Sequence, residues 1–508
     1  MRLPRVGYLA LAGAVFVAAC AERPTEPSTT DRPLAASTTA GLPAGVEAPR
    51  ATDRHLVVFN GNRIPNGFAR DLERLGGEID LGFEAVGAAL VSGLDAAGAE
   101  AVANARGVAI VEPELLLPYE EPELVVDPVR VEADPASPED PASAFFFPRQ
   151  WNLRAVGADV AWAAGELGSS DVTVAILDTG IDYLHADLQS RVDLSRSADM
   201  LGTVIVNEAD PGDPPELVEY VEADTVAKYF PDRHPVTDLN FHGTHVAATV
   251  ASNGLAAAGV TSRTTLMGVK VCGWQISCPF GAIFSGIEHA VENGADVINL
   301  SLGGFVIKSG GGGFHETINR LFNYARRNGV TVVVAAGNDA ADLDHELVPI
   351  EDENGDIVEG HFPSLYAAFC DTPSTVCVSA TGPTAGESVN GPWQNIDASA
   401  PYTNFGRSAI NVAAPGGNTG GVVWAACSSS SLDIPVCQTG NFVVGAAGTS
   451  MATPHTAGLA ALMVDRYGND TGRVGSAMEQ AADDLGEPGT DPFYGKGRIN
   501  VARALGLH

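Results

Sequence analysis

The chain has 508 residues and a formal net charge of −34 at pH 7. This length exceeds one ordinary domain. The acidic net charge argues against nucleic acid as a partner, because a basic footprint is absent from the sequence. The acidity keeps the protein soluble.

Residues 1–20 have the pattern of an export signal. Two arginines flank the start of the apolar stretch Val6–Ala19, which is too short to span a bilayer. The stretch ends at Cys20 in Val-Ala-Ala-Cys, a pattern typical of the bacterial lipobox, whose cysteine is lipidated; ordinary signal cleavage with an incidental cysteine is the alternative. Residues 21–50, rich in Thr, Pro, Ser and Ala, are predicted to be a flexible tether. We therefore expect a secreted or cell-envelope protein, with a lipid anchor to a bacterial membrane if Cys20 is modified.

Residues 51–118 predict a small α+β domain. The expected strands are His55–Phe59, Glu78–Phe83, Ala88–Ser92 and Gly107–Glu112, and the expected helices are Gly67–Leu75 and Ala96–Ala105. Their order, β-α-β-β-α-β, is ferredoxin-like. Residues 119–147 are acidic and rich in proline, and such a segment cannot bury enough apolar surface to fold alone, so we expect a linker.

From residue 148 to 508 the pattern alternates between strands and helices. The expected strands are Val172–Leu177, Leu266–Val271, Asp296–Ser301 and Val330–Asn338, and the expected helices are Gly281–Asn293 and Glu316–Asn328. This alternation predicts an α/β fold with a mostly parallel sheet covered by helices on both faces. The acidic segments Asp199–Asp238 and Asp339–Gly360 are expected to be solvated loops, and Gly310–Gly313 a flexible loop.

Three short motifs carry the chemistry. Asp178 ends an apolar strand in Ile-Leu-Asp-Thr-Gly, His242 opens a helical pattern in His-Gly-Thr-His-Val-Ala, and Ser450 opens another in Gly-Thr-Ser-Met-Ala. A serine hydroxyl is a weak nucleophile until an imidazole takes its proton, and a carboxylate on the far ring nitrogen orients that imidazole. A strand end is where open α/β sheets bind ligands, and a helix N-terminus favours a developing oxyanion. The order Asp, His, Ser is that of one known nucleophilic triad.

All three motifs resemble the active-site motifs of the subtilisin-like serine proteases, and the resemblance extends over roughly residues 150–505. It implies a subtilisin-like fold and a serine endopeptidase that hydrolyses protein or peptide substrates through an Asp178-His242-Ser450 triad and an acyl-enzyme. It also implies that Asn338, after the Val330 strand, donates its side-chain N–H to the oxyanion; losing such a donor costs about 10²–10³ in kcat. The chemistry requires no cofactor.

The resemblance further implies two walls around an extended substrate that binds through main-chain hydrogen bonds. The residues expected to bind substrate are Ile276, Ser277, Cys278, Ser301, Leu302, Gly303 and Gly337. The family usually has glycines where this chain has residues 276–278, so subsite preferences are left open. Taken alone, Gly337 and Asn338 would indicate only a turn.

By the same resemblance, residues 51–118 are an inhibitory propeptide of a zymogen that processes itself. The linker contains or adjoins the cleavage site, and the mature domain is expected to begin near Gln150. A small unrelated α+β domain is the alternative. Structural calcium stays open: Asp187 matches a position that ligates calcium in many relatives, but the loop near Asn253 is short and poor in carboxylates, and the six to eight oxygens that calcium prefers are not found.

The remaining cysteines and histidines are expected to be structural. With Cys20 set aside, the cysteines form three close pairs: Cys272 and Cys278, Cys370 and Cys377, Cys427 and Cys437. In an exported protein these pairs suggest three local disulfides, although six cysteines allow 15 connectivities. We expect His245 to face away from His242, and His455 to be buried and hydrogen-bonded.

Two other functions are weighed. A surface binding protein could keep this fold without activity, but all four catalytic positions hold the expected residues. A lipase or esterase needs Gly-x-Ser-x-Gly and the order Ser, Asp, His, whereas Ser450 lies in Gly-Thr-Ser-Met-Ala and comes last. Cleavage of peptides rather than of short acyl esters alone separates the protease from the esterase.

Overall fold

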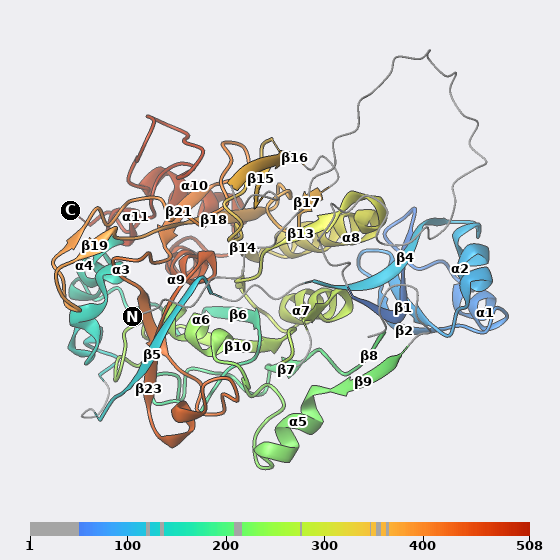
Figure 1. Cartoon of the computed structure of the whole chain (residues 1–508), viewed down its shortest axis with the longest axis horizontal. Helices are drawn as coiled ribbons and strands as arrows, with labels where there is room; N and C mark the ends of the chain where they lie inside the picture. Colours follow the sequence, from blue (N-terminus) through green and yellow to red (C-terminus); the bar gives the residue numbers. More distant parts are fainter. Residues whose placement is uncertain are drawn as a thin grey trace.

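Figure 1 shows the computed structural model of the chain. It describes residues 50–507 apart from 118–121, 133–136, 208–215, 275–276, 346, 352–356 and 362–364. The predicted export signal with Cys20, residues 21–49 of the tether, and Ile276 lie outside the described residues. Within the described part, no helix is both long and apolar enough to cross a membrane.

A seven-stranded sheet forms the middle of the larger domain. Its strands in spatial order are β21 (Val412–Pro415), β18 (Thr375–Thr381), β14 (Thr331–Ala335), β12 (Val297–Leu300), β6 (Thr173–Asp178), β10 (Thr265–Lys270) and β7 (Ala198–Asp199). All neighbouring strands are parallel. Parallel strands covered on both faces are continuous apolar runs, which is the pattern that the sequence shows in these segments.

Helices cover both faces of this sheet (Figure 1). They are α6 (His242–Val250), α9 (Thr449–Tyr467) and α10 (Thr471–Ala481) on one face, and α7 (Phe280–Glu292) and α8 (Lys308–Arg327) on the other. Successive side chains of a strand point to opposite faces. In β6, Val174 and Ile176 accordingly join the core with α6 and α9, whereas Ala175 and Leu177 join the core with α7 and α8. The predicted α/β architecture is confirmed.

The N-terminal module has the predicted element order. It consists of β1 (Ala51–Phe59), α1 (Phe68–Glu73), β2 (Glu78–Phe83), β3 (Ala88–Ser92), α2 (Ala96–Ala103) and β4 (Val108–Leu117). The strands form an antiparallel sheet in the order β4-β1-β3-β2. A small core that includes Phe59, Phe68 and Val102 packs the two helices on it.

Two segments of the larger domain extend the sheet of the module. β11 (Cys278–Pro279) pairs with β4, and β8 (Thr203–Asn207) pairs with β1 and with β9 (Leu217–Val221). The prediction of a solvated loop at 199–238 is therefore wrong for its described residues. Val204 and Val206 are buried against the module, and this tertiary packing outweighs the acidic composition.

The prediction of a flexible loop at Gly310–Gly313 is also wrong, because these residues belong to α8, which begins at Lys308. Glycine disfavours helix, but the Glu112 carboxylate of the module accepts the N–H of Phe314 at 2.8 Å. Phe314 is the seventh residue of α8, so this contact fixes the N-terminal part of the helix to the module and does not cap its first turn. A contact distant in sequence thus supports the helix.

The described part of the acidic linker folds against the larger domain. β5 (Leu124–Arg130) is the third strand of a sheet with β22 (Val423–Ala426) and β23 (Phe442–Ala447). Phe146 is fully buried, and its N–H donates to the Ala256 carbonyl at 2.8 Å. The segment therefore buries apolar side chains against the larger domain, because it cannot form a core of its own.

Shorter elements complete the chain. They are η1 (Pro141–Ser143), η2 (Phe147–Arg149), α3 (Trp151–Ala155), α4 (Ala158–Ala163), α5 (Glu222–Tyr229), β13 (Phe305–Ile307), β15 (Leu347–Glu351), β16 (Ile357–His361), β17 (Leu365–Ala367), β19 (Ala385–Gly386), β20 (Trp393–Gln394), η3 (Pro435–Thr439) and α11 (Val501–Ala504). The pair β15–β16 lies in the second acidic segment, which is therefore not loop throughout.

Candidate active site

Asp178 and His242 meet at the end of the central sheet. Asp178 is the last residue of β6, and His242 is the first residue of α6. The imidazole Nδ1 lies 2.8 Å from Oδ1 of Asp178, and both residues are fully buried. The same oxygen accepts the N–H of Thr179 at 2.7 Å. This geometry orients the ring and leaves Nε2 as the nitrogen for proton transfer.

Ser450 lies in the first turn of α9, which packs against α6. Its hydroxyl donates to the carbonyl of Ser301 at 2.9 Å, and the hydroxyl of Ser301 donates back to the carbonyl of Ser450 at 2.9 Å. In substrate-free sites catalytic hydrogen bonds are often not yet formed and tighten when substrate binds. Transfer of the hydroxyl proton to His242 would require the Ser450 side chain to turn away from the Ser301 carbonyl.

Asn338 follows β14 and faces the start of α9. Its Oδ1 accepts both the N–H and the hydroxyl of Thr449, each at 2.8 Å. Its Nδ2 is buried and has no hydrogen-bond partner among the described residues. A buried donor without an acceptor is costly. The amide is thus held by its oxygen while its N–H groups stay available beside the helix that carries Ser450.

Asn404 was not singled out by the sequence, yet it clamps the loop that carries Asn338. Its Oδ1 accepts the N–H groups of Asp339 and Ala341 at 2.9 and 2.8 Å. Its Nδ2 donates to the carbonyl of Ala336 at 2.9 Å and to the Asp339 carboxylate at 3.0 Å. Asn404 lies in a polar segment without periodicity, so only the fold reveals these contacts.

Asp238 supports the start of α6 and was also missed, because it lies in the segment predicted to be solvated. It is fully buried, and it accepts the hydroxyl of Thr179 at 3.0 Å and the hydroxyl of Thr244 at 2.6 Å. Thr179 in turn accepts the N–H of Gly243 at 3.0 Å. Burial raises the pKa of Asp238, against hydrogen bonds from Thr244 that lower it. Asp238 therefore connects the loop after Asp178 with the helix that starts at His242.

Part of the predicted substrate-binding set lies close to the nucleophile. Ser301, Leu302 and Gly303 follow β12, and Ser301 contacts Ser450 as described. In the segment predicted to form the opposite wall, Ser277 precedes Cys278, which pairs with Leu117 of the module. A strand of the protein itself thus lies along this wall.

Gly337 adopts a φ of +99°. Its N–H donates to the Thr449 hydroxyl at 3.2 Å, and its carbonyl accepts the N–H of Asn404. A Cβ at this position would come within 2.4 Å of the Asn404 amide nitrogen. The glycine therefore permits the turn that places Asn338.

His245 and His455 are buried and hydrogen-bonded. Nε2 of His245 donates to the carbonyl of Val423 at 3.1 Å, and Nδ1 of His455 donates to the carbonyl of Met451 at 2.8 Å. Burial lowers the pKa of His245 to about 3 and that of His455 to about 4. Both rings are neutral near pH 7 and support the two helices of the site.

Three disulfides join the cysteine pairs that the sequence suggested: Cys272–Cys278, Cys370–Cys377 and Cys427–Cys437. The first closes a short loop on the wall that contains Cys278. Bridges of this kind are typical of exported proteins.

The surroundings of Asp187 do not fit calcium. Its two carboxylate oxygens accept three backbone N–H groups, those of Leu255, Ala256 and Ala257, at 2.8–2.9 Å. Backbone donors thus occupy the oxygens that a cation would need. The described residues contain no cluster of three or more His, Cys, Asp or Glu that could hold a metal.

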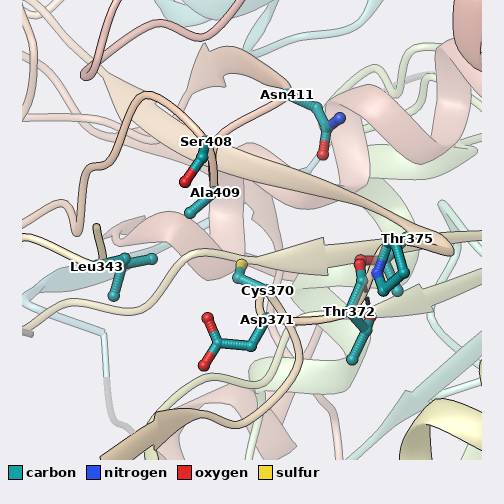
Figure 2. Close-up of a pocket in the computed structure, with 9 residues that line it drawn as sticks. Leu343, Cys370, Asp371, Thr372, Thr375, Ser408, Ala409 and Asn411 are labelled. Carbon is teal, nitrogen blue, oxygen red and sulfur yellow. Dashed lines mark hydrogen bonds between the residues drawn. The ribbon is translucent and has the colours of Figure 1, made fainter. Parts of the chain in front are cut away.

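A separate hollow of about 290 Å³ lies beside the Cys370–Cys377 disulfide (Figure 2). Thr372, Ser408 and Asn411 are among its lining residues. The Asp371 carboxylate accepts the N–H of Ala367 at 2.9 Å. None of the predicted catalytic residues lines this hollow, so it is distinct from the candidate active site.

Comparisons with known proteins agree with this geometry. The model of the subtilase family matches residues 169–497. Thermitase from Thermoactinomyces vulgaris is 28% identical over 372 residues, which are 73% of this chain and 99% of thermitase. A subtilisin from Bacillus pumilus is 30% identical over 338 residues, which are 66% of this chain and 91% of that protein.

Among solved structures, the epidermin leader peptide processing serine protease from Staphylococcus aureus has a TM-score of 0.64 at 18% identity, covering 90% of this chain and 98% of that one. That likeness concerns the fold. The family match spans more than half of the chain and includes the strand ending at Asp178, the helix starting at His242 and the helix carrying Ser450. The chain therefore belongs to the subtilase family and is a serine endopeptidase that hydrolyses peptide bonds.

Proposed function

We propose that Ser450 is the nucleophile, His242 the general acid and base, Asp178 the residue that orients the imidazole, and Asn338 the oxyanion donor. The observation that carries this proposal is the buried 2.8 Å contact between His242 and Asp178, next to the helix of Ser450. The available N–H of Asn338 supports the fourth role.

The reaction follows from these positions. The Oγ of Ser450 attacks the carbonyl carbon of the scissile bond while its proton passes to Nε2 of His242. Asn338 stabilises the negative charge on the carbonyl oxygen. His242 then gives the proton to the leaving amine, so the C–N bond breaks and an acyl-enzyme remains. A water molecule, deprotonated by His242, hydrolyses the acyl-enzyme and restores Ser450.

We infer that peptide substrates lie extended between residues 301–303 and residues 277–278. Support comes from the antiparallel pairing of Leu117 with Cys278, in which an extended strand of the chain itself lies beside residue 278. Gly303 on the opposite wall leaves room for a substrate backbone.

We further propose that residues 51–118 inhibit the enzyme as a propeptide that the enzyme itself removes. Two carboxylates of β4 accept backbone N–H groups from two helices of the larger domain, α7 and α8. Glu114 accepts the N–H of Gly281 at 2.7 Å, and Glu112 accepts that of Phe314 at 2.8 Å. Arg320 of α8 donates to the carbonyl of Phe59 at 3.0 Å. The module thus docks with its last strand on the substrate wall.

The export signal, and lipidation of Cys20, remain parts of this proposal. The three disulfides support export, because such bridges persist in oxidising compartments. Secretion after ordinary signal cleavage is the alternative to the lipid anchor.

Labelling tests the catalytic assignment. The processed enzyme should react with a serine-directed fluorophosphonate, and Ser450→Ala should neither react nor process itself. Labelling should be equal with and without a chelator, because every reacting group belongs to the protein. The matched control is Ser408→Ala, in the hollow of Figure 2, which should label like the wild type. Labelling of Ser450→Ala would refute the assignment.

The Asn404 clamp can be tested by a double-mutant cycle. Asn404→Ala should lower kcat about 10–100-fold with little change in KM, because it frees the loop that positions Asn338. In an Asn338→Ala background the same change should cost little, since the donor is already absent. Asn411→Ala, which removes side-chain hydrogen bonds to Cys377 and Glu479 away from this loop, is the control. Equal losses in both backgrounds would mean a purely structural role.

Two carboxyl groups predict how pH affects release of the module. Burial raises the pKa of Glu112 to about 7, although backbone donors lower it. Burial, then repulsion by Glu292, also raises the pKa of Glu288 on α7 to about 7, with Glu84 of the module adding to the repulsion. Release exposes Glu112. It also removes from Glu288 the repulsion by Glu84 and part of the burial, which raise its pKa, together with the hydrogen bond from Ala85, which lowers it. Because burial is the largest cause for both groups, both pKa values should fall toward the ordinary 4.5.

The docked state therefore binds more protons between pH of about 4.5 and about 7, and its affinity falls as pH rises through this window and is lowest above it. The rate at which activity appears after processing should rise over the same window. Aliquots are assayed at one fixed pH, so effects of pH on catalysis itself do not contribute. Glu112→Gln combined with Glu288→Gln should flatten the profile, and an unchanged profile would assign release to other groups.

A further inference from the structure

The strand β5 lies outside the N-terminal module, and the proposed reaction assigns it no role. β5 runs antiparallel to β23, and β23 leads through Gly448 directly into α9 (Figure 1). Leu124 pairs with Ala447, the last residue of β23. The first residue of β5 therefore pairs with a residue that precedes Ser450 by only three positions in the sequence.

The residue before β5 also lies near the oxyanion loop. Partial burial and the neighbouring carboxylate of Asp339 raise the pKa of Glu123. Asp339 directly follows Asn338, so β5 begins beside both the oxyanion donor and the nucleophile helix.

The edge occupied by β5 is on the leaving-group side of the site. On the other side, Leu117 pairs with Cys278 of the substrate wall. Leu117 precedes Leu124 in the chain, and Leu124 pairs with Ala447 next to the nucleophile helix, so the two contacts occur in the order of the acyl half and the leaving half of a substrate. An extended peptide binds such an edge through main-chain hydrogen bonds. While β5 is paired with β23, the backbone groups on this edge of β23 are not available to a substrate.

The packing of β5 is specific. Val126 pairs with Gly445 and packs on the main core, whereas Val125 is 42% exposed. A Cβ on Gly445 would lie 2.6 Å from Cγ2 of Val126. The glycine of β23 thus leaves the space that Val126 fills.

The segment after β5 is anchored to the larger domain. The N–H of Val131 donates to the carbonyl of Asn441 at 2.9 Å. Val131 and Phe146 are buried in one cluster with Val443 and Ala256. A cut upstream of Leu124 would leave β5 attached through contacts that do not involve the module.

We propose that the chain is cut upstream of Leu124 rather than near Gln150, so that residues 124–130 stay with the mature enzyme. They then occupy the leaving-group side of the active site, where they compete with substrate residues that follow the scissile bond. This inference rests on the proposed peptidase site. An attached strand competes as an intramolecular ligand, with an effective concentration on the order of millimolar. The apparent affinity for extended substrates is then reduced in proportion to the fraction of enzyme molecules in which the edge of β23 is free.

Two substrates separate the two sides of the site in the processed, full-length enzyme. One is a peptide p-nitroanilide, with peptide only before the scissile bond. The other is an internally quenched peptide that extends on both sides. Val126→Asp, which places a carboxylate in the apolar packing of β5, should raise kcat/KM for the quenched peptide by about tenfold and leave the p-nitroanilide unchanged. Val125→Asp, on the exposed side of β5, should alter neither.

Equal effects of Val126→Asp on both substrates, or no effect, would overturn the proposal. So would a mature N-terminus downstream of Arg130 in mass spectrometry. If the wild type cleaved neither substrate, the proposed function itself would fail, which is a different result.

A second variant covers the case in which Val126→Asp yields no folded enzyme. Val125→Cys with Ala446→Cys replaces two residues that pair across β5 and β23. Its oxidised form should cleave the p-nitroanilide normally and the quenched peptide at least about tenfold more slowly. Equal cleavage of the quenched peptide by the oxidised variant and the wild type would overturn the proposal.

Discussion

The buried contact between Asp178 and His242 is the constraint on which the site depends. A buried carboxylate is costly unless donors satisfy it. Asp178 receives the N–H of Thr179 and the imidazole, and the hydroxyl of Thr179 ties the start of α6 to Asp238. The strand end, the turn after it and the helix start are therefore fixed together, and the ring cannot move independently of the sheet.

Hydrogen bonds also fix the loop that carries Asn338, but here the buried groups are side-chain amides instead of a carboxylate. Asn338 uses its oxygen to hold Thr449 and keeps its nitrogen available, so orientation and function belong to different atoms of one side chain. That arrangement leaves a buried donor unsatisfied, a cost that the surrounding hydrogen bonds must offset. Asn404 supplies them by binding both sides of the loop.

The predictable features were those whose signals are local. Continuous apolar strands and helical patterns indicated the α/β fold, and the motifs of Asp178, His242 and Ser450 indicated a nucleophilic triad. Asn404 and Asp238 were not predictable, because their partners are distant in the fold and their surroundings look like polar loops. The helix through Gly310–Gly313 and the strands in the acidic segment depend on contacts with the N-terminal module, which no local pattern reveals.

Both sides of the proposed catalytic centre are covered by the chain itself, but by different interactions. Leu117 covers the acyl-side wall at the end of the module, and we expect docking of the module to weaken as Glu112 of the module and Glu288 of α7 ionise. β5 covers the leaving-group side through pairing with β23 and apolar packing of Val126, and neither interaction involves Glu112 or Glu288. In the proposed scheme, processing and a rise in pH therefore open only the acyl side. Extended substrates must still displace β5. In this scheme the enzyme favours substrates that have few residues after the scissile bond, because β5 covers the edge that binds those residues.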